Sequence, residues 1–443
     1  MFVVFLLLII SFLLSSCWKS ASQKESPYSF LDETNSPLIK ILYINYDRFY
    51  RDYGFWLKQE FPNINFEVVS YEEAIEKNDQ QLLFEIINKE TPDIISIDHS
   101  IFEELIKRGM LMDLESLILR DKYNIEQFVQ PIIEYLKHDG KGKLYGLTPY
   151  FNSRALFYNK TLFDRYQVPY PSERMTWVDV FETARQFPID EVYGFEYVLR
   201  DFNPMILVNE ILRTHGLSYW GPNSKMLIQS NPHFEAIMDM VINAYQEGFI
   251  YSSKDQRKEN YNTTVQTNEE EMFLSGRAAM RYGNYYFLSD LEAARFNKRA
   301  SFEWDIVPEP VDRDNKNYTY NYILYDVFAI YSNSKNKDLA WEILKYIHSE
   351  QSAKNVMLST NSKGLSTLQN YVKDKWGKSL SAFYQLRPRL DNEVIIPFSN
   401  ELAEVAKRAI LDRLSGISTS KEAWNQISTA VEEEYQKRYK EAP

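Results

Sequence analysis

The chain has 443 residues, enough for two or three domains, and its 44% hydrophobic and 25% charged residues are ordinary for a globular protein. The 50 Lys and Arg residues against 62 Asp and Glu residues leave a net charge of −12, and an acidic surface repels phosphate backbones, which argues against a nucleic-acid partner. The single cysteine excludes a disulfide framework and any metal site built from several thiolates.

The chain begins with an apolar run from Phe2 to Leu14 that only Ser11 interrupts. This run is shorter than the about 20 residues that span a membrane and is typical of the core of an export signal. The sequence Leu14-Ser15-Ser16-Cys17 follows and resembles the bacterial lipoprotein signature. The resemblance implies a signal peptide over residues 1–16, lipidation of Cys17 by palmitate or a similar acyl group, and a polar tether over residues 17–37. An ordinary export signal with an incidental cysteine is the alternative.

The next hundred residues alternate strand and helix signals. Short runs of branched apolar residues predict strands over residues 38–44, 65–70 and 93–97. Longer periodic runs predict helices over residues 51–61 and 100–109. Pro92 disfavours helix just before the third of these strands. Because strands separated by helices form βαβ units, the sequence predicts an α/β fold with a parallel sheet.

Helices dominate after Gly146. Thr176-Trp177-Val178-Asp179 has the pattern of a capping box, in which the Thr hydroxyl and the Asp carboxylate each bind the other residue's amide, so a helix is expected to begin at Trp177. Further helices are predicted within residues 201–250 and over residues 337–348, 399–414 and 420–439. Residues 251–270 are predicted to be a polar loop, and residues 300–332 to contain strands and turns.

Motifs of the common enzymes are absent. The chain has no nucleophile elbow, zinc-peptidase motif or phosphate-binding loop, and its five histidines lack the spacing of metal ligands. The sequence therefore predicts no catalytic residue, no metal site and no cofactor. A pair of carboxylates brought together by the fold would escape this search, so a surface glycoside hydrolase lipoprotein stays as an alternative.

Several short motifs follow one another in a fixed order behind the export signal. They are Thr91-Pro92-Asp93-Ile94-Ile95, Lys143-Leu144-Tyr145-Gly146-Leu147-Thr148-Pro149, Ala155-Leu156-Phe157-Tyr158-Asn159-Lys160, Met272-Phe273-Leu274-Ser275-Gly276-Arg277-Ala278-Ala279-Met280, Trp304-Asp305-Ile306-Val307-Pro308 and Ser334-Lys335-Asn336-Lys337-Asp338-Leu339-Ala340-Trp341. In this order they resemble family 1 of the extracellular solute-binding proteins, the maltose-binding-protein class of bacterial ABC sugar importers. One departure is Thr148, which is inserted where that class has Gly-Leu-Pro.

The resemblance implies a two-lobed α/β fold of the periplasmic-binding-protein type, with hinge strands between the lobes. One lobe is expected over residues 38–149 and about 309–348, and the other over residues 150–308 and about 349–443. The implied protein is a non-enzymatic, monomeric receptor, lipid-anchored on the extracytoplasmic face of the bacterial cell membrane. It would capture a mono- or oligosaccharide between its lobes and deliver it to the permease subunits of an ABC importer. A binder of a non-sugar solute with the same fold is the second alternative.

A sugar requires aromatic rings for its C–H faces and polar groups for its hydroxyls. Asp98 follows the strand predicted over residues 93–97, at the edge where open α/β sheets bind ligands, although it could equally cap the next helix. Tyr285 and Tyr286 hold the position from which, by the resemblance, an aromatic ring stacks on the sugar. The full set of expected ligand contacts is Asp98, Tyr150, Asn152, Arg154, Tyr285, Tyr286, Tyr325, Asp326, Lys363 and Ser366.

Overall fold

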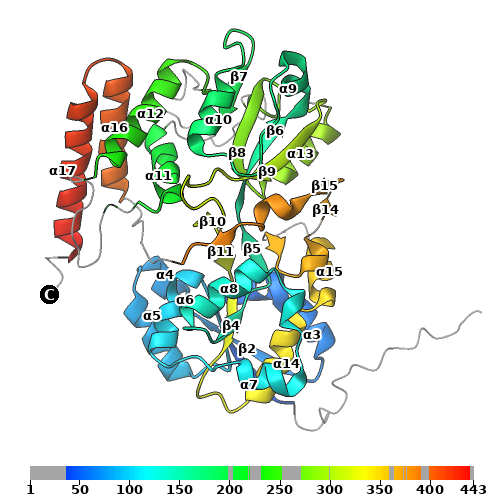
Figure 1. Cartoon of the computed structure of the whole chain (residues 1–443). Helices are drawn as coiled ribbons and strands as arrows, with labels where there is room; N and C mark the ends of the chain where they lie inside the picture. Colours follow the sequence, from blue (N-terminus) through cyan, green and yellow to red (C-terminus); the bar gives the residue numbers. More distant parts are fainter. Residues whose placement is uncertain are drawn as a thin grey trace, which may run out of the picture. The chain divides into compact units, whose positions relative to one another are not determined.

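The computed structural model describes residues 36–197, 203–217, 219, 231–251, 271–298, 300–358, 364–372, 374–375, 377–390 and 399–439. The expected signal peptide, Cys17, most of the tether and nearly all of the predicted 251–270 loop lie outside these residues. The chain is mixed α/β and divides into two compact units (Figure 1). The first unit comprises residues up to Ile97, Lys107–Met112 and Phe328–Thr360, and the second comprises the remainder. The lobe boundaries expected near residues 149 and 308 stay a prediction.

The first unit is built on a sheet in which the strands are neighbours in the order β2-β1-β3-β12. These strands are β1 (Leu38–Tyr43), β2 (Asn65–Ser70), β3 (Ile94–Ile97) and β12 (Val327–Ile330). Strand β1 pairs in parallel with both β2 and β3, which confirms the predicted parallel pairing. The helical elements are α2 (Tyr46–Phe49), η1 (Tyr50–Gly54), α3 (Phe55–Glu60), α4 (Glu72–Glu76), α5 (Gln80–Glu90), α14 (Lys337–Ile347) and α15 (Glu350–Leu358).

A buried carboxylate joins distant segments of the first unit. Asp93 is 6% exposed, and its Oδ2 accepts a hydrogen bond from the backbone N–H of Lys40 in β1 at 3.0 Å. Its Oδ1 accepts bonds from the hydroxyl of Ser334 at 2.6 Å and from the side-chain amide of Asn336 at 3.2 Å. Asp93 lies just before β3, and Ser334 and Asn336 lead into α14. Two motifs separated by 241 residues are therefore held together by one side chain.

Two larger sheets shape the second unit. A four-stranded sheet has the order β7-β8-β6-β9, and a three-stranded antiparallel sheet has the order β11-β5-β13. Their strands are β5 (Tyr150–Asn152), β6 (Arg154–Asn159), β7 (Tyr193–Glu196), β8 (Ala278–Asn284), β9 (Trp304–Pro308), β11 (Ile323–Tyr325) and β13 (Leu365–Ser366). The remaining strands are short: β4 (Gly146–Leu147), β10 (Tyr318–Thr319), β14 (Asp374–Lys375), β15 (Lys378–Ser379) and β16 (Arg387–Pro388).

The helices of the second unit cover these sheets around a core rich in aromatic side chains. Trp177 and Phe181 from α10 are buried against Phe195 of β7 and Tyr282 of β8. The helical elements are α6 (His99–Lys107, with Lys107 in the first unit), α7 (Glu115–Asp121), η2 (Ile125–Gln127), α8 (Gln130–Asp139), α9 (Lys160–Tyr166), α10 (Trp177–Ala184), α11 (Pro204–Thr214), α12 (His233–Gln246), α13 (Phe287–Phe296), η5 (Gln369–Tyr371), η6 (Leu380–Phe383), α16 (Asn400–Leu414) and α17 (Ser420–Tyr439). Within the described part of the chain, no helix combines the length and the apolar character needed to cross a membrane.

The observed helices match the predicted ones closely. The predicted capping box is present at the start of α10, where the Thr176 hydroxyl accepts from the Asp179 N–H at 3.2 Å and the Asp179 carboxylate accepts from the Thr176 N–H at 2.7 Å. Helices α14, α16 and α17 confirm the three helices predicted near and beyond residue 337. The helix predicted over residues 51–61 begins earlier, at Tyr46, and contains a π-helical turn.

The substitution Thr176→Ala should lower the free energy of unfolding by about 1 kcal/mol, because it removes the acceptor for an amide at the start of α10. Chemical denaturation of the purified protein measures this change. Thr183→Ala, a substitution of the same type inside the same helix, is the control and should change stability by less than about 0.5 kcal/mol. Equal losses in the two variants would contradict a capping role for Thr176.

Candidate functional site

Strand β5 brings four of the predicted ligand contacts onto one face of a sheet. Tyr325 of β11 and Ser366 of β13 both lie directly opposite Tyr150 of β5, and directly opposed residues in an antiparallel pair project to the same face. Asn152 is two residues beyond Tyr150 and shares that face. Tyr150, Asn152 and Ser366 are buried, whereas Tyr325 is half-buried. The sheet therefore groups residues that are up to 216 positions apart in the chain.

Thr148 ties the three strands of this sheet together. Its side chain is buried, and its hydroxyl oxygen lies 2.8 Å from the carbonyl oxygen of Tyr150 and 2.6 Å from that of Tyr325. Its own carbonyl accepts a hydrogen bond from the hydroxyl of Thr367, just after β13, at 2.7 Å. The residue that departs from the motif at 146–149 therefore supports the site, a role that the sequence analysis missed.

Tyr285 and Tyr286 join the group from the end of β8. The backbone N–H of Tyr285 donates to Oδ1 of Asn152 at 3.3 Å. Tyr286 directly precedes α13 and is 38% exposed. Burial, followed by the neighbouring Tyr325 hydroxyl and the charge of Asp326, raises the pKa of Tyr286 to about 12. The hydroxyls of Tyr286 and Tyr325 therefore interact with each other.

Asp326 is next to the tyrosines and has an unusual backbone conformation. Its φ of 51° lies in the left-handed region, which is uncommon for residues other than glycine, although the short polar side chain of Asp tolerates it. Asp326 directly follows β11 and directly precedes β12. Because Asp326 contributes to the raised pKa of Tyr286, the two side chains interact electrostatically.

Arg154, at the start of β6, is held by an acidic partner and an aromatic ring. Its guanidinium lies 2.8 Å from Oε1 of Glu210 in α11, and its carbon Cζ lies 5.3 Å from the centre of the Tyr282 ring. Burial acts to lower the pKa of Arg154, but the charge of Glu210 together with nearby tyrosines and Glu309 outweighs it, and the pKa is raised above its ordinary value. Arg154 therefore stays positively charged. The Glu210 carboxylate holds its guanidinium in place and balances its charge.

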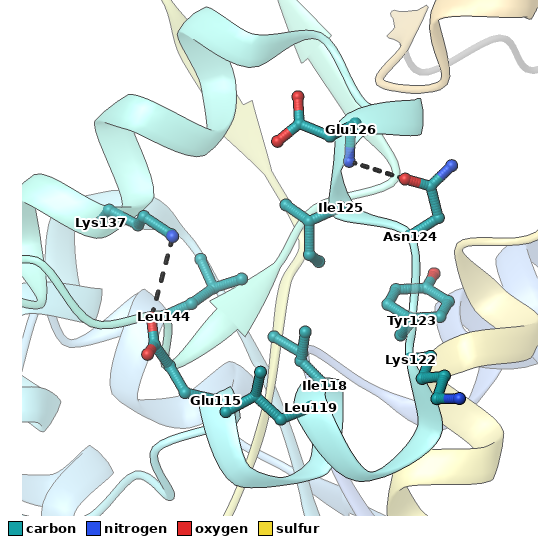
Figure 2. A pocket seen from close by; sticks show the side chains of 10 residues that line it. All are labelled: Glu115, Ile118, Leu119, Lys122, Tyr123, Asn124, Ile125, Glu126, Lys137 and Leu144. Carbon is teal, nitrogen blue, oxygen red and sulfur yellow. Dashed lines mark hydrogen bonds and ion pairs between the residues drawn. The ribbon is translucent and has the colours of Figure 1, made fainter.

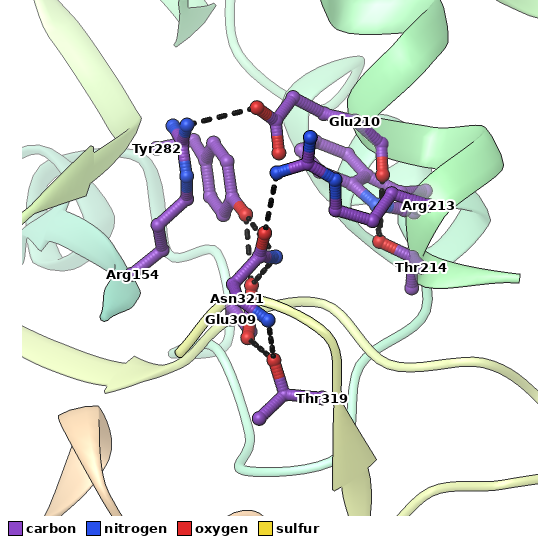
Figure 3. A network of polar contacts seen from close by, with 9 residues as sticks. Arg154, Glu210, Arg213, Thr214, Tyr282, Glu309, Thr319 and Asn321 are labelled. Atoms are coloured by element: carbon purple, nitrogen blue, oxygen red, sulfur yellow. Dashed lines mark hydrogen bonds and ion pairs between the residues drawn. The ribbon is translucent and has the colours of Figure 1, made fainter. Parts of the chain in front are cut away.

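A second buried carboxylate, Glu309, connects Arg154's surroundings to the loop after β10 (Figure 3). Glu309 is 3% exposed and accepts hydrogen bonds from the hydroxyl of Tyr282 at 2.8 Å, the amide of Asn321 at 2.5 Å and the hydroxyl of Thr319. Burial raises the pKa of Glu309, and the three donors oppose this rise. In the described residues, no three His, Cys, Asp or Glu side chains are grouped as a metal ion would require.

Three of the predicted contacts, Asp98, Arg154 and Lys363, are not joined to the group around β5 by the observations above. Asp98 is exposed and accepts a hydrogen bond on Oδ1 from the N–H of Ser100 at 2.9 Å, so it has the alternative role of capping α6. A contact between Asp98 and a ligand stays a prediction. Lys363 lies outside the described residues.

A separate pocket of about 660 Å³ lies beside α7, η2 and α8 (Figure 2). Two of its lining residues, Glu115 and Lys137, form an ion pair of 3.7 Å. Its apolar walls come from Ile118, Leu119, Ile125 and Leu144. Since none of the predicted ligand contacts lines this pocket, it is distinct from the site around β5.

The family model for bacterial extracellular solute-binding proteins matches residues 52–354 of the chain. The chain belongs to this family. A curated relative, a binding protein of Brucella abortus (strain 2308), is 20% identical over 364 residues, which cover 78% of this chain and 79% of the relative.

Solved structures show the same two-lobed fold. A sugar transporter protein from Rhizobium etli in an open conformation has a TM-score of 0.60 and 19% identity, covering 89% of this chain and 99% of its own. The sugar-binding protein MalE from Xanthomonas citri has a TM-score of 0.61 and 14% identity, covering 90% and 98%. A substrate-binding protein from Listeria monocytogenes in complex with cycloalternan has a TM-score of 0.54 and 18% identity, covering 91% and 99%. The predicted fold class, a two-lobed α/β protein of the periplasmic-binding type, is confirmed.

Glu309→Gln should flatten the dependence of stability on pH. Because folding raises the pKa of Glu309 above its ordinary value of 4.5, the folded state holds this proton more tightly than the unfolded state does. The contribution of Glu309 to the free energy of unfolding therefore falls as pH rises from the ordinary value through the folded pKa. Glutamine does not titrate and removes this fall.

Chemical denaturation at a series of pH values between about 4 and 8 compares the two proteins across that window. Glu433→Gln, on an exposed position of α17, is the matched control and should follow the wild-type profile. Parallel profiles for wild type and Glu309→Gln would show that the buried carboxylate does not titrate as described.

Proposed function

We propose that this protein is a lipid-anchored extracellular receptor that binds a carbohydrate between two lobes and delivers it to the permease of an ABC importer. The observation that carries the carbohydrate assignment is the group of side chains around β5. The rings of Tyr285, Tyr286 and Tyr325 suit the apolar C–H faces of a sugar, while the side chains of Asn152 and Ser366 suit its hydroxyls. Structurally similar proteins are known in complexes with cycloalternan, D-mannitol and maltotetraose, which supports this class.

Charge pairing supports an uncharged ligand over an anion. Arg154 is the cation among the predicted contacts that the structure describes, and Glu210 lies 2.8 Å from it. An anionic solute would have to compete with that carboxylate, whereas a sugar hydroxyl can accept from the guanidinium without changing the charge of the site. Peptides and other non-sugar solutes remain the alternative class.

Closure of two lobes would convert binding into a signal. The proposed lobes are residues 38–149 with about 309–348 and residues 150–308 with about 349–443. A ligand that contacts both lobes only in the closed form shifts the population towards that form, which a permease can recognise. This role makes and breaks no covalent bond, so the proposed protein is not an enzyme and needs neither metal nor cofactor.

Tyr285→Ala should weaken sugar binding about tenfold, because it removes one of the rings on which a sugar would lie. A thermal-shift screen of mono- and oligosaccharides identifies the ligand, since a ligand at a hundred times its Kd stabilises the folded state by about 2.7 kcal/mol. Calorimetry then compares the variant with wild type. Tyr170→Ala, at a 43% exposed tyrosine outside the predicted contacts, is the control. Full affinity in Tyr285→Ala would remove this site assignment, and release of reducing sugar from the ligand would indicate a glycoside hydrolase.

Cys17→Ala should abolish lipid attachment, because the thiol is the proposed acylation site. In bacteria that express the chain, labelled palmitate should enter the wild type and the control Ser20→Ala, and both should sediment with membranes. The Cys17→Ala protein should remain unlabelled. Labelling of Cys17→Ala at the wild-type level would overturn the lipoprotein assignment.

A further inference from the structure

Helix α13 ends in an aromatic side chain that is exposed to solvent. Phe296, its last residue, is 88% exposed, more than any other large apolar side chain among the described residues. Phe287, at the other end of the helix, is buried and meets Phe157 of β6 edge-on, with ring centroids 4.9 Å apart. The start of α13 is therefore packed on the sheet, whereas its end leaves most of an aromatic ring in water.

A hollow of about 330 Å³ lies beside this ring. It is lined by Leu288, Leu291, Glu292, Arg295 and Phe296 of α13 and by Trp304 of the neighbouring strand β9 (Figure 1). Leu288 and Leu291 are 1% exposed and Trp304 is 7% exposed, so the floor of the hollow is apolar. Glu292 and Arg295 are exposed and form its rim. Ligand pockets measure about 300 to 1,000 Å³, so this hollow is at the lower limit and suits a single side chain better than a larger ligand.

The hollow is separate from the proposed sugar site. Tyr286 directly precedes α13 and Phe296 ends it, and ten positions along a helix correspond to about 15 Å. Of the predicted ligand contacts that the structure describes, none lines the hollow. Sugar binding at the site around β5 therefore does not account for the exposed ring or for the apolar floor beside it.

The exposed ring and the hollow lie on one surface patch. In a two-fold symmetric dimer both subunits use the same patch, so a ring of one copy can enter a hollow of the other only if a single patch carries both features. Phe296 meets this condition because it is itself one of the residues that line the hollow. A second copy of the chain would thus supply a ring for each hollow and a hollow for each ring.

The charges on α13 fit a second copy that runs antiparallel to the first. An antiparallel arrangement that sets Phe296 level with Leu291 of the second copy also sets Arg295 level with its Glu292, because both pairs are centred on the same point of the helix. The two-fold axis repeats both pairs. One register therefore places an aromatic ring against an apolar floor and a guanidinium against a carboxylate, as complementary interfaces do.

We propose that α13 and the hollow beside it form a docking surface for a second copy of this chain, in which Phe296 of each copy fills the hollow of the other. This inference goes beyond the proposed function and replaces the expected monomer with a weak dimer. One helix face offers less than the roughly 1,200 Å² that stable interfaces bury, so the dissociation constant lies in the micromolar range or higher. Copies anchored to one membrane, as proposed above, meet at a raised effective concentration.

Sedimentation equilibrium of the chain without its signal peptide, from low to high micromolar concentration, measures this dimer. A reducing buffer prevents Cys17 from cross-linking two copies, and about 0.15 M salt screens the repulsion between chains of charge −12. The average mass of wild type should rise with concentration towards that of a dimer. Phe296→Ala should raise the dissociation constant about tenfold, because it removes the ring from both contacts. Leu119→Ala, at a 76% exposed leucine of α7, is the matched control and should associate as wild type does.

A charge exchange tests the antiparallel register and leaves the apolar contact in place. Glu292→Arg and Arg295→Glu each put like charges on facing positions and should each weaken association about fivefold. The double variant Glu292→Arg/Arg295→Glu restores opposite charges and should associate as wild type does. An equimolar mixture of the two single variants should form a mixed dimer, because both facing pairs are then oppositely charged. Glu433→Arg, on an exposed position of α17, is the control.

The outcomes distinguish this dimer from unspecific association. A wild type that stays monomeric over the whole range, or a Phe296→Ala variant that associates equally well, would overturn the docking surface. Equal association of all the charge variants would overturn it too, whereas recovery in the double variant and in the mixture supports it. Phe296→Ala should melt near the temperature of wild type because its side chain is mostly exposed, so a lost dimer is not the result of unfolding. Sugar binding is measured separately, so the receptor function stands or falls on its own test.

Discussion

The pairing of β5 with β11 on one side and β13 on the other is the constraint on which the candidate site depends. Tyr150, Tyr325 and Ser366 share one register position in this sheet, and a slip of a single residue would turn a strand's side chains to the opposite face. Gly364 helps to prevent such a slip, because a Cβ atom there would come within 2.4 Å of the carbonyl oxygen of Phe151. Thr148 bonds to the segments on both sides. The tyrosine group is therefore positioned by backbone geometry before any ligand arrives.

Elsewhere in the chain, buried carboxylates hold separate segments together through hydrogen bonds. Asp93 in the first unit and Glu309 in the second each collect hydrogen bonds from three separate groups. Glu196 does the same for the turn before β8, accepting from the N–H groups of Met272 and Phe273 and from Arg281. A carboxylate has about four acceptor positions, so one residue can join several segments, and these bonds offset the cost of removing its charge from water.

Much of the fold and part of the site follow from local sequence. Strand and helix periodicity located β1, β2, β3 and most of the long helices, and the capping box at Thr176 marked the start of α10 because its hydrogen bonds span only three residues. The family motifs indicated Tyr285 and Tyr286. The hydrogen bonds of Glu309 could not be predicted from local sequence, because its partner Tyr282 is 27 residues away. Nothing in the sequence around a single glutamate indicates that its side chain is buried. The π-helical turn that ends at Gly54 was missed for a similar reason, since an extra residue in one turn hardly changes the apolar periodicity.

The bonds of Asp93 also bear on the order in which the chain can fold. Its partners Ser334 and Asn336 are synthesised 241 and 243 residues later. Until then, the N-terminal segment of the nascent chain lacks two of the hydrogen-bond donors to Asp93. Contacts between such distant positions slow folding, because closing the long loop between them costs conformational entropy before the contacts can form. The first unit can therefore complete the hydrogen bonds of Asp93 only after residue 336 has been synthesised.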